Sequence, residues 1–346
     1  MTTLLIIFVV ILLLHLIMGL CMFRKYPQDE VEKTFSLIVI SHNEERMLMP
    51  LLESLDKLIY NKELYEIILV DDNSTDKTWD IISTYAKSAP NITALKPNPK
   101  YHDYLGKKAG LQSALDLAKH EILLFTDADA TVPPNWISSL NTYFTPKTGM
   151  VIGYIRGAKL RFIKRYKRIV SSGIFAAACG LGFPFSCSGG NLAVRKQALL
   201  NVGGYESIKS FPSGDDKQLL NLINKTSYRI AYNSEIKVIE RPRQVELKQA
   251  YQQAIRHYGK LSLSSPLFQV GFILIVLYYL SVPVLSFWDI RFLILYLLSN
   301  LFFHLLSCIK HQENLKLEDI FINLIYPYYM LYFTLVGSFS EVKWKK

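Results

Sequence analysis

The chain has 346 residues, 50% of them hydrophobic, and a formal net charge of +10. This length allows about two domains, and the mean hydropathy of +0.18 is high for a protein that lies wholly in water. A basic balance fits nucleic acid or positive residues beside membrane spans. Because the sequence contains no nucleic-acid-binding motif, we favour a membrane and expect no nucleic-acid partner. The four cysteines lack CxxC spacing, which argues against a zinc site or a disulfide framework.

Residues 3–23 form an almost continuous apolar run at the N-terminus. A helix needs about 20 such residues to cross a bilayer. A cleaved signal peptide would place positive charge before the run, whereas here Arg24 and Lys25 follow it. We therefore expect a retained anchor over residues 1–25, with the domain that follows in the cytoplasm.

Residues 34–244 are expected to form an α/β domain. Short apolar runs that end in polar residues alternate with stretches of helical periodicity. Such runs are typical of strands buried on both faces, and the alternation predicts a mainly parallel sheet with right-handed crossovers. The expected strands are 35–40, 66–70, 93–95 and 121–126, and the expected helices begin near residues 47, 77 and 106.

Two carboxylates, Asp127 and Asp129, directly follow the fourth expected strand. Open α/β sheets bind ligands at the carboxyl ends of their strands. A magnesium-like ion prefers oxygen ligands and usually shares its shell with substrate phosphates. The pair is therefore a candidate metal–diphosphate site, and the alternative is a solvated turn.

Seven short motifs share one order with a known family. They are SHNEE, ILVDDNSTDKT, GKKAGLQSAL, FTDADA, SCSGGNLAVRKQALLNVGGYES, PSGDDKQLL and QQAIRHYGK. Together, from about Ser36 to Lys260, they resemble the family 2 glycosyltransferases of the GT-A fold. The resemblance implies a Rossmann-like sheet, a nucleotide-sugar donor and a divalent cation, manganese or magnesium. The last motif departs from the family, since His257 stands where Trp is usual.

The resemblance implies a role for several residues on the donor side. Glu44 and Asp72 would contact the nucleoside, although Glu44 is also explained as a carboxylate at a helix N-terminus. Asp129 would be the direct metal ligand, with Asp127 as a second ligand or a ribose contact. The other donor-side candidates are Lys108 (or Lys107) and Arg256 at the diphosphate, Gln253 on the same helix face as Arg256, and Gly189 and Gly190 where the donor sugar approaches the backbone.

Asp216 matches the family's catalytic base, and Asp215 stands beside it. A sugar hydroxyl needs a base to remove its proton, and two adjacent carboxylates repel each other, which raises one pKa and suits a base. The alternative is a loop turn after Ser213 and Gly214. A lipid phosphate needs no base because its oxygen is already ionised, so this pair favours a hydroxyl acceptor.

The composition changes after Lys260. Residues 245–262 are expected to form an amphipathic helix at the membrane surface, and residues 266–340 to contain about three spans, at 267–288, 292–309 and 320–339. The basic loop at Lys310 fits the cytoplasmic side, but the lysines of the C-terminal tail then fall outside. Either one stretch is re-entrant or the tail is an exception. A basic stretch at 160–170 contacts anionic headgroups or is a solvated helix face.

These observations predict an inverting, metal-dependent glycosyltransferase in the cell (inner) membrane, crossing it several times. It would move a hexosyl or N-acetylhexosaminyl group from a nucleotide sugar, which the resemblance implies is UDP-linked, to a hydroxyl of a membrane-held lipid or glycan. Three alternatives stay open: a processive polysaccharide synthase, a polyprenyl-phosphate glycosyltransferase and a non-catalytic membrane scaffold.

Overall fold

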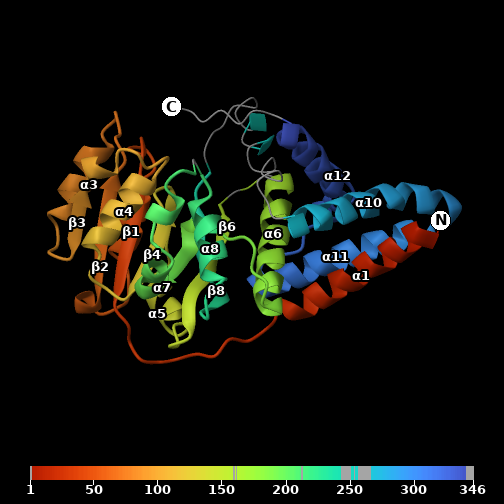
Figure 1. Cartoon of the computed structure of the whole chain (residues 1–346), viewed down its shortest axis with the longest axis horizontal. Coiled ribbons are helices and arrows are strands. Elements are labelled where there is room, and N and C mark those ends of the chain that lie inside the picture. Colours follow the sequence, from red (N-terminus) through yellow and green to blue (C-terminus); the bar gives the residue numbers. More distant parts are fainter. Residues whose placement is uncertain are drawn as a thin grey trace. The chain divides into compact units, whose positions relative to one another are not determined.

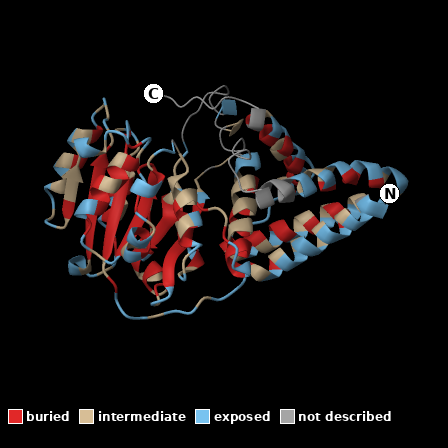
Figure 2. Ribbon diagram, in the orientation of Figure 1, coloured by how far each residue is buried: buried red, intermediate tan, exposed pale blue. Residues whose placement is uncertain are grey.

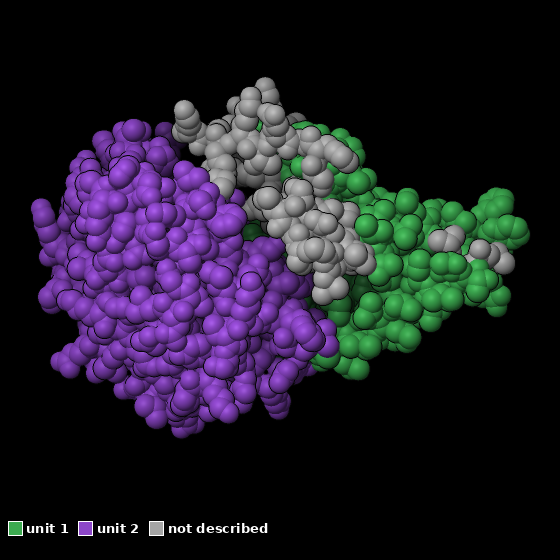
Figure 3. Space-filling view, viewed as in Figure 1, with its two compact units in different colours: residues 1–22, 160–174, 243–346 green, residues 23–159, 175–242 purple. Residues whose placement is uncertain are grey.

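The computed structural model describes residues 2–158, 160, 162–211, 213–242, 251–252, 254–255 and 266–339. The chain divides into two compact units (Figure 3). The sheet unit contains residues 23–159 and 175–242, and the helical unit contains residues 1–22, 160–174 and 243–346. Each unit is described by itself below.

The sheet unit is built on one eight-stranded sheet (Figure 1). Its strands lie in the order β3-β2-β1-β4-β7-β6-β8-β5. The strands are β1 (Phe35–Ser41), β2 (Tyr65–Asp71), β3 (Ile92–Leu95), β4 (Ile122–Asp127), β5 (Ala130–Thr131), β6 (Thr148–Gly157), β7 (Leu192–Arg195) and β8 (Arg229–Glu240). The four strands expected from the sequence are β1 to β4, and each observed end is within one residue of the expected one.

The first four strands of the sheet are parallel to one another, and two strands, β7 and the edge strand β5, run antiparallel to their neighbours. Strand β1 pairs in parallel with β2 and β4, and β2 with β3, whereas β7 runs antiparallel to both β4 and β6. Strand β6 pairs in parallel with β8. The sheet is therefore mixed but mostly parallel, as expected for the GT-A fold.

Helices cover both faces of the sheet, which explains why the strands are apolar on both sides. One face of β1 packs in the main core with α2, α3 and α5, through residues such as Leu37, Leu52 and Trp136 (Figure 2). Helix α4 packs on the other face, where Gly110 lies close to Val70 and Ile40. The helices of this unit are α2 (Met49–Leu55), α3 (Thr78–Ala86), α4 (Lys108–Leu117), α5 (Trp136–Asn141), α7 (Lys196–Asn201) and α8 (Asp215–Ile223).

Among its described residues, the helical unit contains four apolar helices. They are α1 (Thr2–Cys21), α10 (Pro266–Trp288), α11 (Arg291–His311) and α12 (Leu317–Phe339). Phe8 of α1 packs with Tyr278 and Val282 of α10 and with Tyr296 of α11. In the part of the chain that is described, two segments are long and apolar enough to cross a membrane, Arg291–His311 and Leu317–Gly337, and the apolar parts of α1 and α10 are shorter.

Helix α6 (Phe162–Leu181) divides between the two units. Its first half belongs to the helical unit, because Tyr166 packs against Ile322 and Tyr326. Residues 160–174 therefore interrupt the 34–244 domain that the sequence predicted as continuous. The expected interface helix at 245–262 lies almost entirely outside the described residues, so it stays a prediction.

Candidate active site

Strands β1, β2 and β4 end at the same edge of the sheet. In register, Ile40 lies beside Asp127, and Ser41 lies beside Asp71. The polar segments that follow these strands therefore meet at one edge, as expected for a ligand site in an α/β sheet. Candidate donor-side residues from three separate motifs come together in this way.

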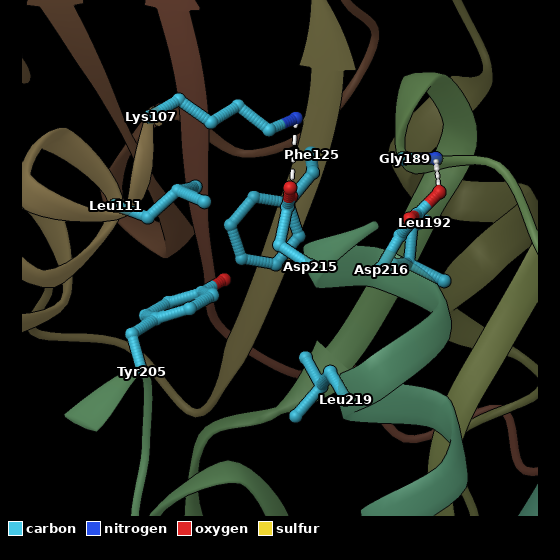
Figure 4. A pocket seen from close by; sticks show the side chains of 9 residues that line it. All are labelled: Lys107, Leu111, Phe125, Gly189, Leu192, Tyr205, Asp215, Asp216 and Leu219. Atoms are coloured by element: carbon cyan, nitrogen blue, oxygen red, sulfur yellow. Dashed lines mark hydrogen bonds and ion pairs between the residues drawn. The ribbon is translucent and has the colours of Figure 1, made fainter. Parts of the chain in front are cut away.

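A pocket lies at this edge, between α4, β4 and the start of α8 (Figure 4). Its walls are both polar and apolar. They are formed by Lys107, Leu111, Phe125, Gly189, Leu192, Tyr205, Asp215, Asp216 and Leu219. The pocket therefore brings together the two carboxylates of the predicted catalytic base, Asp215 and Asp216, and one of the two candidate lysines, Lys107. It also includes Gly189 of the segment 188–190, which we call the glycine loop.

Lys107 is the cation of this pocket. Its Nζ lies 3.2 Å from Oδ2 of Asp215 (Figure 4). Desolvation alone would lower the pKa of Lys107, but the carboxylates of Asp215, Asp127 and Asp216 raise the pKa above its ordinary value. The ammonium of Lys107 thus interacts with Asp127 of the candidate metal site and with Asp215 and Asp216 of the predicted base.

The adjacent Lys108 has a different position, which corrects the assignment made from the sequence. Its side chain is fully buried, and Nζ donates to the backbone carbonyls of Leu105 (3.3 Å) and Phe211 (2.5 Å). Lys108 therefore joins the loop before α4 to the loop before α8. It is neither a solvated surface charge nor a group that lines the pocket.

Asp216 is held by backbone N–H groups. Gly189 N donates to its Oδ2 at 3.0 Å, and Lys217 N donates to its Oδ1 at 2.8 Å. Asp215 and Asp216 form the first turn of α8 after Gly214, whose φ of 76° is left-handed and suits glycine. Carboxylates at a helix N-terminus are stabilised by the helix dipole.

Gly190 lies so close to Asp127 that any larger residue there would force the Asp127 carboxylate to move. A Cβ on Gly190 would lie 2.5 Å from Oδ2 of Asp127 and 2.9 Å from Cδ1 of Ile155. The loop is also tied to β4, because Thr126 Oγ1 donates to the Gly190 carbonyl at 3.0 Å. By contrast, a Cβ on Gly189 would make only ordinary contacts, at 3.7 Å or more.

Asp127 lies among several carboxylates. Although the residue is exposed, desolvation of its carboxyl raises its pKa to about 6, with Lys107 opposing the rise and Asp129, Glu240 and Asp216 adding to it. Asp129 is buried, and its carbonyl accepts from Arg241 N at 3.0 Å. In the described part of the chain, no three His, Cys, Asp or Glu side chains are grouped so that they could hold a metal ion by themselves.

Glu44 and Asp72 lie where β1 and β2 end, and neither is among the residues that line the pocket. Glu44 is buried, and its backbone N–H donates to Thr78 Oγ1 at 2.8 Å. Asp72 has a raised pKa, caused first by desolvation, with His42 lowering it and Asp71 raising it. Their predicted nucleoside contacts stay predictions.

Two residues that were not predicted from the sequence, Tyr205 and Glu240, contribute to the site. Gln253 and Arg256 lie outside the described residues, so their roles stay predictions. Tyr205 lines the pocket, and its pKa is raised by burial, Asp215 and Asp216. Glu240, paired in register with Ala130, contributes to the field at Asp127. Nothing in the sequence indicates that β5 pairs with β8, so Glu240 was not predicted as part of the site.

Comparison with known proteins places this fold and site in a family. A family model described as glycosyl transferase family 2 matches residues 36–202, and one described as glycosyl transferase family group 2 matches residues 122–338. The second match covers more than half of the chain. The chain belongs to the family 2 glycosyltransferases.

Individual relatives agree with this class. Beta-monoglucosyldiacylglycerol synthase of Nostoc sp. is 31% identical over 193 residues, which cover 52% of this chain and 40% of the relative. Probable glycosyltransferase YdaM of Bacillus subtilis is 25% identical over 212 residues, covering 57% and 48%. The chain thus spans less than half the length of these relatives.

The fold is also that of a solved structure. Mannosyltransferase PcManGT from Pyrobaculum calidifontis, in complex with GDP-Man and Mn2+, has a TM-score of 0.61 and 16% sequence identity. The similarity covers 95% of this chain and 94% of that chain. At this identity the similarity shows the GT-A fold and nothing about the substrates.

Proposed function

We propose that this protein is an inverting glycosyltransferase. It transfers a sugar from a nucleotide-sugar donor, linked to UDP, to a hydroxyl of a lipid or glycan held at a membrane. The observation that carries the proposal is the position of Lys107 between Asp127 and the Asp215–Asp216 pair. One ammonium thus interacts with a carboxylate of the candidate metal site and with the carboxylates of the predicted base, at the edge of the sheet where ligands bind.

Each group has a task in the transfer. The acceptor hydroxyl gives its proton to a carboxylate of the Asp215–Asp216 pair as its oxygen attacks the anomeric carbon and the bond to the diphosphate breaks. Lys107 offsets the negative charge that grows on the leaving diphosphate. A single direct displacement inverts the anomeric carbon, and the pocket needs no covalent nucleophile for it.

A divalent cation fits the oxygen-rich side of this site. Asp127 is crowded by Asp129, Glu240 and Asp216, and Gly190 leaves open the space next to Asp127 that a Cβ would fill. Manganese or magnesium prefers such oxygen ligands and takes the rest of its shell from phosphate and water, in line with the absence of a three-ligand protein cluster among the described residues. Bound there, the ion would stabilise the leaving diphosphate. The Mn2+ in the PcManGT structure supports the same proposal.

The helical unit would hold the enzyme in the cell (inner) membrane. Two of its helices are long and apolar enough to cross a bilayer. Arg24 and Lys25 follow α1, and Lys310 lies in the last turn of α11, so the positive-inside tendency favours a cytoplasmic sheet unit. The name of the Nostoc relative, a glucosyldiacylglycerol synthase, supports a lipid acceptor.

The test uses the purified full-length protein with a panel of nucleotide sugars, Mn2+ or Mg2+, and extracted membrane lipids. Asp216→Asn should lower kcat at least about 100-fold if the acceptor is a hydroxyl, whereas exposed Glu53→Gln serves as the control. An unchanged kcat in Asp216→Asn would identify a phosphate acceptor instead. Full activity of Asp129→Ala would exclude the metal role, and a ladder of product lengths would identify a polymerase.

A further inference from the structure

A buried ion pair fixes the first half of α6 in the helical unit. Arg165 Nη1 donates to both carboxylate oxygens of Asp319, at 2.8 and 2.9 Å. Asp319 is fully buried, and it also accepts from the backbone N–H of Lys316 and lies 3.2 Å from Nε2 of His304. A buried carboxylate needs such partners, so the rotation of α6 about its axis is set by this contact.

A second group of contacts involves the next residue, Tyr166, and Gly173, which lies about two turns further along α6. The hydroxyl of Tyr166 donates to Asn323 Oδ1 at 3.1 Å, and its ring stacks on His304 with centroids 4.4 Å apart. A Cβ on Gly173 would lie 2.1 Å from Ser307 Oγ, so α6 and α11 approach closely there. These contacts define which face of α6 is packed and which is open.

The open side at the start of α6 is apolar as well as basic. Phe162 is 60% exposed and Leu317 is 74% exposed. Arg165 also donates to the Asn314 carbonyl, so the first turn of α6 lies against the connection between α11 and α12. We call this surface the α6 surface, formed by Phe162, Ile163, Lys164, Leu315, Lys316 and Leu317.

The charge of the α6 surface favours an anionic partner. Residues 162–170 contain four basic residues and no acidic one. Residues 310–319 contain two lysines and three acidic residues; Asp319 is neutralised by Arg165, and Lys316 Nζ lies 3.8 Å from Glu318 Oε1 in a solvent-exposed pair that a phosphate can replace. Exposed apolar side chains beside lysines are typical of a helix that lies in the headgroup region of a membrane. Insertion there removes the apolar side chains from water while the lysines contact the headgroups.

We propose that the α6 surface binds anionic phospholipids of the membrane leaflet in which it lies. Phe162 and Leu317 extend between acyl chains, and Lys164 and Lys316 bind phosphate groups of the headgroups. The buried Arg165–Asp319 pair holds these groups at one depth. This inference rests on the membrane location proposed above, but it does not depend on the transfer reaction.

The experiment measures thermal unfolding of the full-length protein in detergent during titration with phosphatidylglycerol or phosphatidylcholine. Phosphatidylglycerol should raise the Tm of the wild type, and phosphatidylcholine should do so much less. The double variant Lys164→Gln/Lys316→Gln should need roughly 20-fold more phosphatidylglycerol for half of the effect, since each lysine near an anionic surface contributes about a fivefold gain. The control is Lys57→Gln/Lys62→Gln, which removes two exposed lysines of the sheet unit.

A second measurement tests the apolar part and does not depend on stability. The fluorescence of Phe162→Trp in nanodiscs, with the wild type subtracted, should be quenched by lipids brominated on the acyl chains. Equal responses to the two headgroups, an unchanged titration in the double variant, or an unquenched Trp would each overturn the proposal. None of these readouts needs transferase activity, so a failure here is distinct from a failure of the proposed function.

Discussion

Lys107 Nζ and Asp215 Oδ2 are 3.2 Å apart, which joins the start of α4 to the start of α8 across the pocket. The two residues are more than a hundred positions apart in the chain. The single ammonium of Lys107 offsets part of the negative charge of Asp215, Asp127 and Asp216. A bound diphosphate would compete for the same ammonium, so donor binding and the charge of the base pair are linked through Lys107.

Lys107→Met should therefore reduce kcat far more than it changes the donor KM. Loss of one donor at a developing charge costs about 100- to 1,000-fold in kcat. Lys107→Arg, which keeps the charge, should recover part of the rate. Steady-state kinetics with the best donor of the panel measures both constants. A rise in KM alone would mean that Lys107 binds the donor equally well in the ground state and the transition state.

Gly190→Ala should strongly reduce activity, while Gly189→Ala should not. A Cβ at position 190 overlaps Asp127 Oδ2 at 2.5 Å, whereas one at position 189 contacts nothing closer than 3.7 Å. We expect a loss of about 100-fold for Gly190→Ala, since small displacements in an active site have effects of that size. Equal activities of the two variants would show that the glycine loop is not close to the reacting groups.

Lys108→Met should act on stability and geometry. Met has a similar length, but it leaves the carbonyls of Leu105 and Phe211 without this donor. We expect the free energy of unfolding to fall by about 2 kcal/mol, the usual cost of unpaired buried groups. Denaturant titration measures it, and the donor KM should rise because two loops of the pocket lose their link. A variant with normal stability would contradict the role assigned to Lys108.

Asp127→Asn should stabilise the protein at neutral pH while it abolishes transfer. The folded pKa of Asp127, about 6, lies above the ordinary 3.8, so ionisation of Asp127 is less favourable in the folded state. The stabilisation by Asn should be full above pH 6 and should disappear as the pH falls from 6 to about 4. After allowance for the exposure of Asp127, we expect about 1 kcal/mol.

Chemical denaturation at pH 4, 5, 6 and 7.5 tests this pH dependence, with Glu53→Gln as the matched control. A stabilisation that is the same at all four pH values would mean that the charge of Asp127 is not its cause. Stabilisation by loss of an active-site charge is a common trade-off between stability and function.

The sheet and most of the candidate site could be predicted because their signals are local. Apolar runs buried on both faces gave β1 to β4, and the polar residues after them, Asp127 among these, follow from the strand ends. The choice between Lys107 and Lys108 is not local. The two residues enter α4 about 100° apart, and only the packing of α4 against the sheet determines which one faces the pocket.

Other parts depend on contacts distant in sequence. Glu240 affects Asp127 because β8 pairs with β5, and a strand pairing between residues a hundred positions apart leaves no pattern in either segment. The first half of α6 falls within the predicted 34–244 domain, as a basic stretch that contacts headgroups or is a solvated helix face. Its place in the helical unit depends on the ion pair between Arg165 and Asp319, which cannot be predicted from the sequence alone.

The reversal of direction at β7 has a consequence for how such an enzyme diversifies. Because Leu192 pairs with Phe125 in an antiparallel strand, Gly189 and Gly190 enter the sheet at the edge where β4 leaves it. The chain between Asp127 and Gly190 thus starts and ends at the same edge of the sheet. Because this stretch includes β6, which pairs with both β7 and β8, only its connecting loops can change in length while the strands at both of its ends stay unchanged.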